Sequence, residues 1–116
     1  MIDNRRHKRV PFSAVAAVSY KDKVNVYAIE AFIADMSMSG VGLYSETAIE
    51  IDRDISLFIE FPGNDGMSRT DSIGGHVVYS NLLGTKYFTG IEFNELINPL
   101  RQPFLFERLQ RILAWE

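Results

Sequence analysis

The stretch Ile33-Ala34-Asp35-Met36-Ser37-Met38-Ser39-Gly40-Val41-Gly42-Leu43 lies between two segments whose composition is typical of β-strands. It contains the pattern Asp-x-Ser-x-x-Gly, formed by Asp35, Ser37 and Gly40. These residue types interrupt strands and form turns, because aspartate and serine side chains bond nearby backbone amides and glycine accepts unusual φ angles. The stretch therefore predicts two consecutive strands joined by a turn that carries an acid and a hydroxyl group.

The segments around this turn predict a protein built mainly of β-strands. Residues 24–34 are rich in β-branched and aromatic side chains that fall on both faces, so we expect a long strand with a bulge or bend. Residues 55–61 show the cleanest alternation of apolar and polar side chains. Further strands are expected at residues 13–20, 41–45, 70–80 and 86–93. About six short strands with no helix between them are typical of an antiparallel barrel or sandwich.

The C-terminal part of the chain changes to a helical period. Apolar residues recur there at steps of three and four, which predicts a helix with one apolar stripe over about residues 103–115. Pro103 suits the first helical turn, where its missing N–H removes no hydrogen bond. The stripe consists of Phe104, Leu105, Leu109, Ile112 and Leu113. We expect it to close an open end of the barrel; the alternative is a helix used for dimerisation or partner docking.

The composition indicates one globular domain over residues 1–116, large enough to bury a sizeable core. We expect a basic flexible arm at residues 1–12, a barrel at residues 13–93 and a helical segment at residues 99–116. The absence of cysteine excludes disulfides, thiolate nucleophiles and cysteine-ligated metals. No apolar run is long enough for a membrane span, and the N-terminus lacks the apolar region of a signal peptide. A cytoplasmic location is the expectation.

The charge is distributed unevenly along the chain. Residues 1–9 contain four arginine or lysine residues and one aspartate, which leaves a net charge of +3 there and −6 on the remainder. An acidic body with one short basic arm is a poor match for a long nucleic acid, whose binding depends on many phosphate contacts. It suits one small anionic ligand better. The alternative is that the arm is a solvated, frayed terminus.

The arm and the turn offer complementary hydrogen-bonding groups. Arg5 and Arg9 form the pattern Arg-x-x-x-Arg, and a guanidinium can bind a phosphate or the O6 and N7 edge of guanine in bidentate fashion. Asp35 supplies acceptors for the donors on the Watson–Crick edge of guanine, and Ser37 supplies a hydroxyl. Gly40 would permit a positive φ or a close approach of backbone to ligand. The alternative is that these turn residues are purely structural.

The two motifs together, 26 residues apart from Arg9 to Asp35, resemble the signature of the PilZ family, bacterial receptors for cyclic di-GMP. Gly90-Ile91-Glu92-Phe93 is similar to a strand near the end of the family's barrel. The resemblance implies a six-stranded antiparallel β-barrel with a C-terminal α-helix, binding cyclic di-GMP on its outer face. By the same resemblance, Arg5 and Arg9 would hold phosphate and guanine, Asp35 and Ser37 guanine and phosphate, and Gly40 would shape the turn.

Two further residues are assigned to the site by the same resemblance. Arg6 would assist its neighbours, because many family members carry an adjacent arginine. Tyr79 would stack on a guanine, a contact that contributes about 1–3 kcal/mol per base. The alternative for Tyr79 is a strand aromatic that packs in or beside the core.

These observations favour a binding protein over an enzyme. His7 and His76 are too few for a metal site, and no catalytic motif is present, so we expect neither activity nor a cofactor. The leading hypothesis is a cyclic di-GMP receptor for second-messenger signalling that orders its arginine arm over the ligand and signals to an unidentified effector protein. The alternatives are a PilZ-like adaptor that binds no ligand and, less favoured, a barrel that binds single-stranded nucleic acid.

Overall fold

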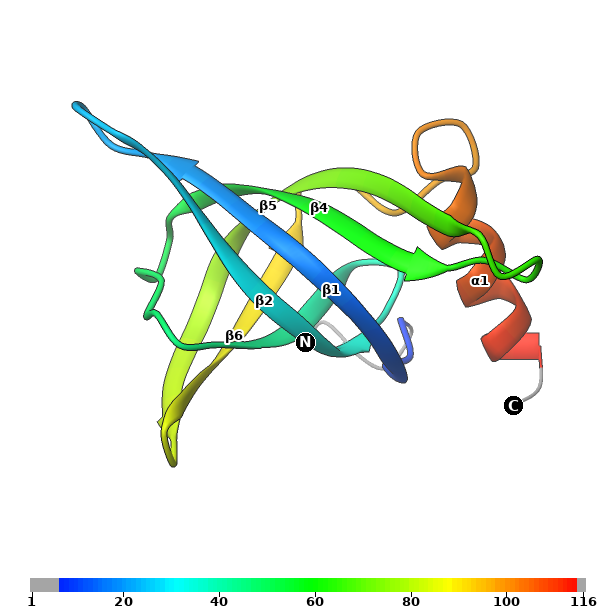
Figure 1. Ribbon diagram of the computed structural model, residues 1–116, viewed down its shortest axis with the longest axis horizontal. Helices are drawn as coiled ribbons and strands as arrows, with labels where there is room; N and C mark the ends of the chain where they lie inside the picture. The colour runs from blue at the N-terminus through cyan, green and yellow to red at the C-terminus, as the bar shows by residue number, and fades with distance from the viewer. Residues whose placement is uncertain (1–6, 115–116) are drawn as a thin grey trace.

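The computed structural model describes residues 7–114, which form six antiparallel strands and one helix (Figure 1). The strands close into a ring in the order β1-β2-β3-β6-β5-β4. This confirms the six-stranded barrel with a C-terminal helix and excludes the sandwich. The elements are β1 (Val10–Lys21), β2 (Val26–Met36), β3 (Gly40–Ser45), β4 (Asp54–Pro62), β5 (Ser68–Leu83), β6 (Lys86–Phe93) and α1 (Pro103–Ala114).

Alternation of side chains between the two faces of each strand builds the core. β4 is the clearest case, because Ile55, Leu57, Ile59 and Phe61 are buried and the residues between them are exposed. Each strand contributes an inward row of this kind, and the ring encloses them away from water. The cleanest periodicity in the sequence therefore predicted both a strand and its buried face.

The barrel begins earlier than the sequence suggested. β1 starts at Val10, and both Val10 and Phe12 are buried, so residues 10–12 belong to the barrel and not to the arm. Pro11 between them is exposed and lies at a register irregularity in the pairing of β1 with β2, which is where a strand tolerates a residue without an N–H. Residues 1–6 of the arm lie outside the described residues.

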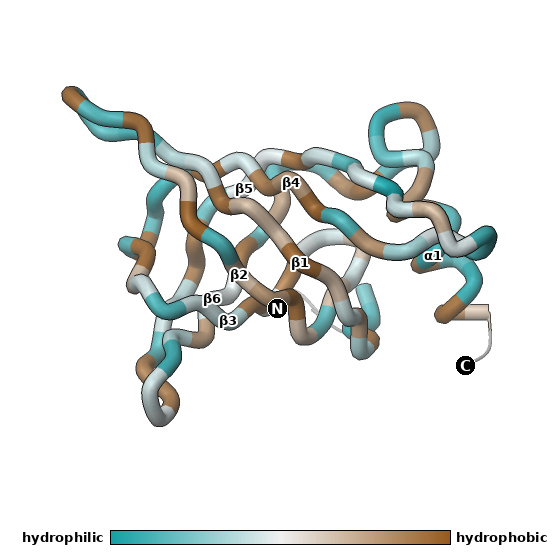
Figure 2. The backbone as a smooth tube through the Cα atoms, viewed as in Figure 1, coloured by the Kyte–Doolittle hydropathy of each residue, from teal (hydrophilic) through white to brown (hydrophobic). Residues whose placement is uncertain are grey.

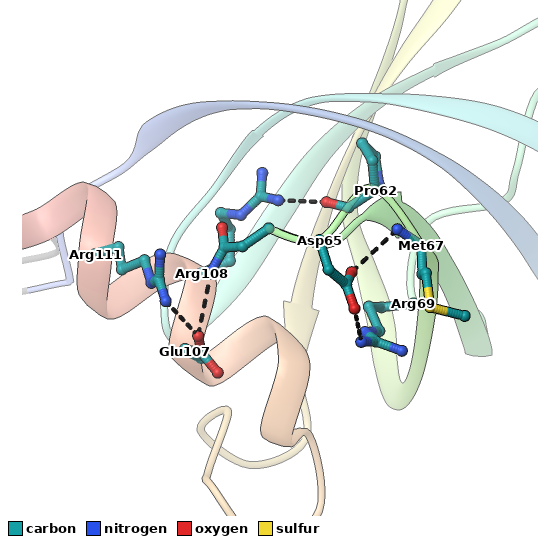
Figure 3. A network of polar contacts seen from close by, with 8 residues as sticks. Pro62, Asp65, Met67, Arg69, Glu107, Arg108 and Arg111 are labelled. Carbon is teal, nitrogen blue, oxygen red and sulfur yellow. Dashed lines mark hydrogen bonds and ion pairs between the residues drawn. The ribbon is translucent and has the colours of Figure 1, made fainter.

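Helix α1 lies at one end of the ring, whereas the tips of the β1–β2 and β5–β6 hairpins project at the other end (Figure 1). Leu105 and Leu109 are fully buried in the barrel core, so the predicted apolar stripe is used within the protein's own fold. Arg108 donates a hydrogen bond to the Pro62 carbonyl (Figure 3). Its guanidinium also lies over the Phe61 ring, 5.2 Å from the ring centroid, and both contacts tie α1 to the β4–β5 hairpin.

Asp71 of β5 provides the N-terminal cap of α1. Its carboxylate accepts a hydrogen bond from the backbone N–H of Leu105 at 2.8 Å, satisfying an amide that the helix itself leaves unpaired. Burial raises the pKa of Asp71, although the amides of Leu105 and Phe104 act in the opposite direction. The folded state therefore favours the protonated acid, and its contribution to stability falls as pH rises through the raised pKa.

We expect Asp71→Ala to lower the free energy of unfolding by about 1–3 kcal/mol, because buried helix amides lose their acceptor. Asp71→Asn keeps an acceptor and removes the charge. Its stability relative to the wild type should therefore rise between pH 4 and pH 7, measured by urea unfolding at several pH values. Asp54→Asn, at an exposed position of β4, is the matched control. A difference between Asp71→Asn and the wild type that stays constant with pH would contradict this account.

Candidate functional site

Arg9 and Asp35 meet on the outside of the barrel. The guanidinium Nη1 of Arg9 donates to Oδ1 of Asp35 at 2.7 Å, and the two side chains are 41% and 33% exposed. Arg9 immediately precedes β1, and Asp35 lies opposite Pro11 near the end of β2, so the pairing of these strands brings the two residues together. Arg9, at the end of the basic arm, is therefore in direct contact with Asp35, the acid of the turn.

A β-bulge turns Asp35 outward. The register of β2 against β3 shifts between Ile33 and Asp35, which confirms the bulge expected in this strand. Ile33 and Met36 are both buried, although they are three residues apart and regular alternation would place them on opposite faces. The extra residue reverses the alternation, so that Met36 enters the core and Asp35 faces solvent beside Arg9.

Ser37 is part of the internal structure of the turn. The residue is 2% exposed, and its Oγ accepts a hydrogen bond from the backbone N–H of Ser39 at 3.1 Å. The Ser37 backbone N–H donates to the Gly40 carbonyl at 2.9 Å and closes the turn. Ser37 therefore lies within the turn and not on the outer face that carries Asp35.

Gly40 is required by a neighbouring strand. Its φ is not positive, and a Cβ atom at this position would lie 2.6 Å from the carbonyl oxygen of Ile91 on β6. The same Cβ position lies 3.5 Å from Nη2 of Arg9. Gly40 therefore permits a close approach of β3 to β6 and not to a ligand. The Arg9 side chain occupies the space next to it.

Two more glycines on this face are covered by aromatic rings. In the register, Asp35, Gly42, Gly90 and Tyr79 form one row across four strands. A Cβ on Gly42 would lie 2.7 Å from the Phe88 ring and 2.9 Å from Asp35 Oδ1, and one on Gly90 would lie 2.1 Å from the Tyr79 ring. The rings of Phe88 and Tyr79 thus rest directly on the backbone, which forms a smooth platform next to the carboxylate.

A second bulge gives Tyr79 its position. The register of β5 against β6 shifts between Val77 and Tyr79, so Tyr79 and not Val78 stands opposite Gly90. Tyr79 is half-buried and its ring centroid lies 6.0 Å from that of Phe88. Tyr79 is therefore on the outer face of the barrel, beside the core and not within it.

Among the described residues, carboxylates outnumber guanidinium groups around the site. Glu92 lies opposite Gly40 in the register, and its exposed side chain is 3.6 Å from Nε2 of His76. Within residues 7–114, Asp35 and Glu92 thus provide two carboxylates near one guanidinium, that of Arg9. Among residues 7–114, no group of three or more acidic or histidine side chains is arranged to hold a metal ion, and no helix is long and apolar enough to cross a bilayer.

The structure brings together part of the predicted site. Arg9, Asp35, Gly40 and Tyr79 share the outer face, whereas Ser37 is buried in the turn. Arg5 and Arg6 lie outside the described residues. The sequence reasoning missed Gly42, Phe88 and Glu92 and did not assign Gly90 to the site. Glycines inside strands are a usable signal, because they mark places where another group approaches the backbone closely.

We expect Gly90→Ala to displace the Tyr79 ring and to lower the free energy of unfolding by about 1–3 kcal/mol, because the added Cβ overlaps the ring. Proton NMR of the Tyr79 ring and urea unfolding measure the two effects. Gly74→Ala is the control, since its Cβ would meet mainly the movable side-chain amide of exposed Asn94 at 3.1 Å. Equal costs for both variants, with unchanged Tyr79 resonances, would show that this contact is not needed.

Comparisons with known proteins agree with this architecture. A family model described as PilZ domain matches residues 3–114. The Bacillus subtilis inhibitor of motility MotI/DgrA has a TM-score of 0.69 and 14% sequence identity, over 97% of this chain and 53% of that one, so this chain spans about half its length. The PilZ domain of Escherichia coli YcgR, solved with c-di-GMP, has a TM-score of 0.55 and 20% identity, over 95% and 88% of the two chains. A comparison with curated proteins gives no significant match. The chain belongs to the PilZ domain family, a family of cyclic di-GMP receptors.

Proposed function

We propose that this protein is a receptor for cyclic di-GMP and binds it on the outer face that carries Arg9, Asp35 and Tyr79. PilZ domains are generally receptor domains without catalytic activity. The observation that carries the proposal is the ion pair between Arg9 and Asp35, which joins the two separate motifs beside an aromatic platform. Support also comes from the YcgR PilZ domain, which shares the fold and whose structure contains c-di-GMP.

Each group on this face suits one part of the ligand. A guanidinium can bind the O6 and N7 edge of guanine or a phosphate, and a carboxylate can accept hydrogen bonds from the guanine Watson–Crick edge. In the proposal, Arg9 and Asp35 bind one guanine and Tyr79 stacks on a base. Ser37 acts indirectly, since its buried hydroxyl holds the turn that positions Asp35.

The Arg9–Asp35 ion pair presents little resistance to ligand binding. Ion pairs with this degree of exposure contribute about 0–1 kcal/mol, whereas a hydrogen bond to a charged group contributes about 1.5–3 kcal/mol. A ligand that replaces the ion pair therefore gains more than it disrupts. The pair also holds both side chains close to the positions that they need for binding.

The arm has a specific electrostatic role in this proposal. Arg9 alone does not offset the carboxylates of Asp35 and Glu92, so a doubly anionic ligand requires additional positive charge. Arg5 and Arg6 supply it and bind the phosphates. In this proposal the arm closes over the bound ligand and so changes the surface that an effector protein contacts, which provides the output in a bacterial signalling pathway.

A second candidate function is that of an adaptor which binds no nucleotide. The motif residues have partners within the fold, because Ser37 closes the turn, Asp35 pairs with Arg9 and Gly40 packs against Ile91. Structural requirements alone would account for these residues. The two functions differ in nucleotide binding. A receptor binds cyclic di-GMP and loses affinity when the arm is altered, whereas an adaptor does not bind it at all.

We expect isothermal titration calorimetry to detect cyclic di-GMP binding with micromolar or tighter affinity, and Arg9→Ala to weaken it about 10- to 100-fold. The loss corresponds to one or two charge-assisted hydrogen bonds. Asp35→Asn should weaken it less, because the amide keeps one acceptor and loses the charge.

Arg101→Ala is the matched control, because Arg101 forms an exposed ion pair with Glu95 at 2.8 Å outside the predicted site. Its affinity should equal that of the wild type. Absence of binding at 100 μM ligand, or an Arg9→Ala variant that binds as well as the wild type, would favour the adaptor.

A further inference from the structure

Three large apolar side chains lie together on the outer face of β1, β2 and β4. Outward residues of a solvated antiparallel barrel are usually hydrophilic. Here Val15, Phe32 and Phe58 face outward and are 39%, 53% and 47% exposed. They lie on adjacent strands, since Val15 pairs with Phe32 and Phe58 pairs with Ala17 two residues further along β1. A contiguous exposed apolar patch of this kind marks an interaction surface.

This patch has the form of a groove with β1 as its floor, which we call the β1 groove. Its floor includes Val15 and Ala17, and its walls include Phe58 and Glu60 of β4 and Glu30 of β2. The associated cavity has a volume of about 400 Å³. Figure 2 shows β1 mostly in brown and pale tones through the body of the barrel, because the strand has no charged residue between Val10 and Tyr20. Small side chains on the floor leave space between larger ones on the walls.

The geometry of the groove fits an α-helix. Ala17 on the floor carries only a methyl group, which permits the close axis-to-axis approach of about 8–10 Å at which helices pack on neighbouring elements. β1 is paired on both edges, with β2 and with β4, so its backbone cannot accept an added strand from a partner. The protein's own helix α1 packs its apolar stripe into the end of the barrel and is not available for this face.

The walls carry negative charge. Glu30 and Glu60 are exposed on opposite sides of the floor, and neither carboxylate has an ion-pair partner among residues 7–114. Glu60 accepts a hydrogen bond from the hydroxyl of Ser68 at 2.8 Å. Two copies of the groove facing each other would bring four carboxylates together, which disfavours a symmetric contact between copies of this chain. A partner with basic residues flanking an apolar stripe is complementary to this arrangement.

We propose that the β1 groove binds an amphipathic helix of a partner protein, with a stripe of small or medium apolar side chains flanked by lysine or arginine. This interaction does not require a nucleotide. The groove is connected to the Arg9–Asp35 face through Phe32, Tyr44 and Phe88, which are adjacent in the strand register, and the Tyr44 and Phe88 ring centroids are 4.8 Å apart. A bound helix would thus lie close to the face that carries Arg9 and Asp35.

The test is phage display of helical 18-residue peptides against the chain of residues 1–116 without cyclic di-GMP. We expect the enriched peptides to share apolar residues at helical spacing with lysine or arginine on both sides. In fluorescence anisotropy with the best peptide, Ala17→Glu should weaken binding at least tenfold, because it places a charge on the floor. Leu100→Glu, at a 93% exposed apolar position outside the groove, should not.

A second variant keeps the test independent of any effect on folding. Glu30→Gln with Glu60→Gln preserves side-chain size and should reduce both the affinity and its dependence on salt. The proposal is overturned if no peptide is enriched, if the enriched peptides are acidic, or if they bind Ala17→Glu as well as the wild type. It is also overturned if sedimentation shows a dimer of the wild type that Ala17→Glu dissociates, because the occupant is then a second copy. Because the peptide-binding experiments contain no nucleotide, a negative result in them does not bear on cyclic di-GMP binding.

Discussion

The strict alternation of side chains in a closed barrel is the constraint on which the rest of this structure depends. Every residue on a strand points either into the core or out to solvent, and only a bulge can change this order. Asp35 and Tyr79 both follow such an irregularity, and without it each would point inward. The two bulges thus place an acid and an aromatic ring on the same outer face without disturbing the hydrophobic interior.

Around these two residues the fold provides a packed aromatic surface with an exposed ion pair beside it. Glycines at positions 42 and 90 let the rings of Phe88 and Tyr79 approach the backbone closely, so the platform is fixed by packing. The Arg9–Asp35 contact is solvent-exposed and can be exchanged for a ligand contact at little cost. A rigid base with an exchangeable ion pair at its edge suits reversible binding of a small charged molecule.

Much of the fold could be predicted from the sequence, and less of the site. Period-two patterns such as residues 55–61 and the stripe of α1 report burial directly, so the strands and the helix followed from them, whereas the barrel followed from the family resemblance. The cap that Asp71 provides to α1 and the outward turn of Tyr79 depend on contacts between distant segments, which local patterns do not contain. For Ser37, the motif identified the correct turn, but its burial depends on how the turn folds back on itself.

The central claim is that cyclic di-GMP binds over the Arg9–Asp35 ion pair and the Tyr79 platform. The most direct measurement is a proton–nitrogen NMR titration with the ligand, which follows each backbone amide and the Arg9 side-chain N–H. The account predicts the largest shifts at Arg9, Asp35, Gly42 and Gly90, with those of α1 nearly unchanged. Unchanged spectra at saturating ligand, or shifts confined to the end of the barrel that carries α1, would contradict it.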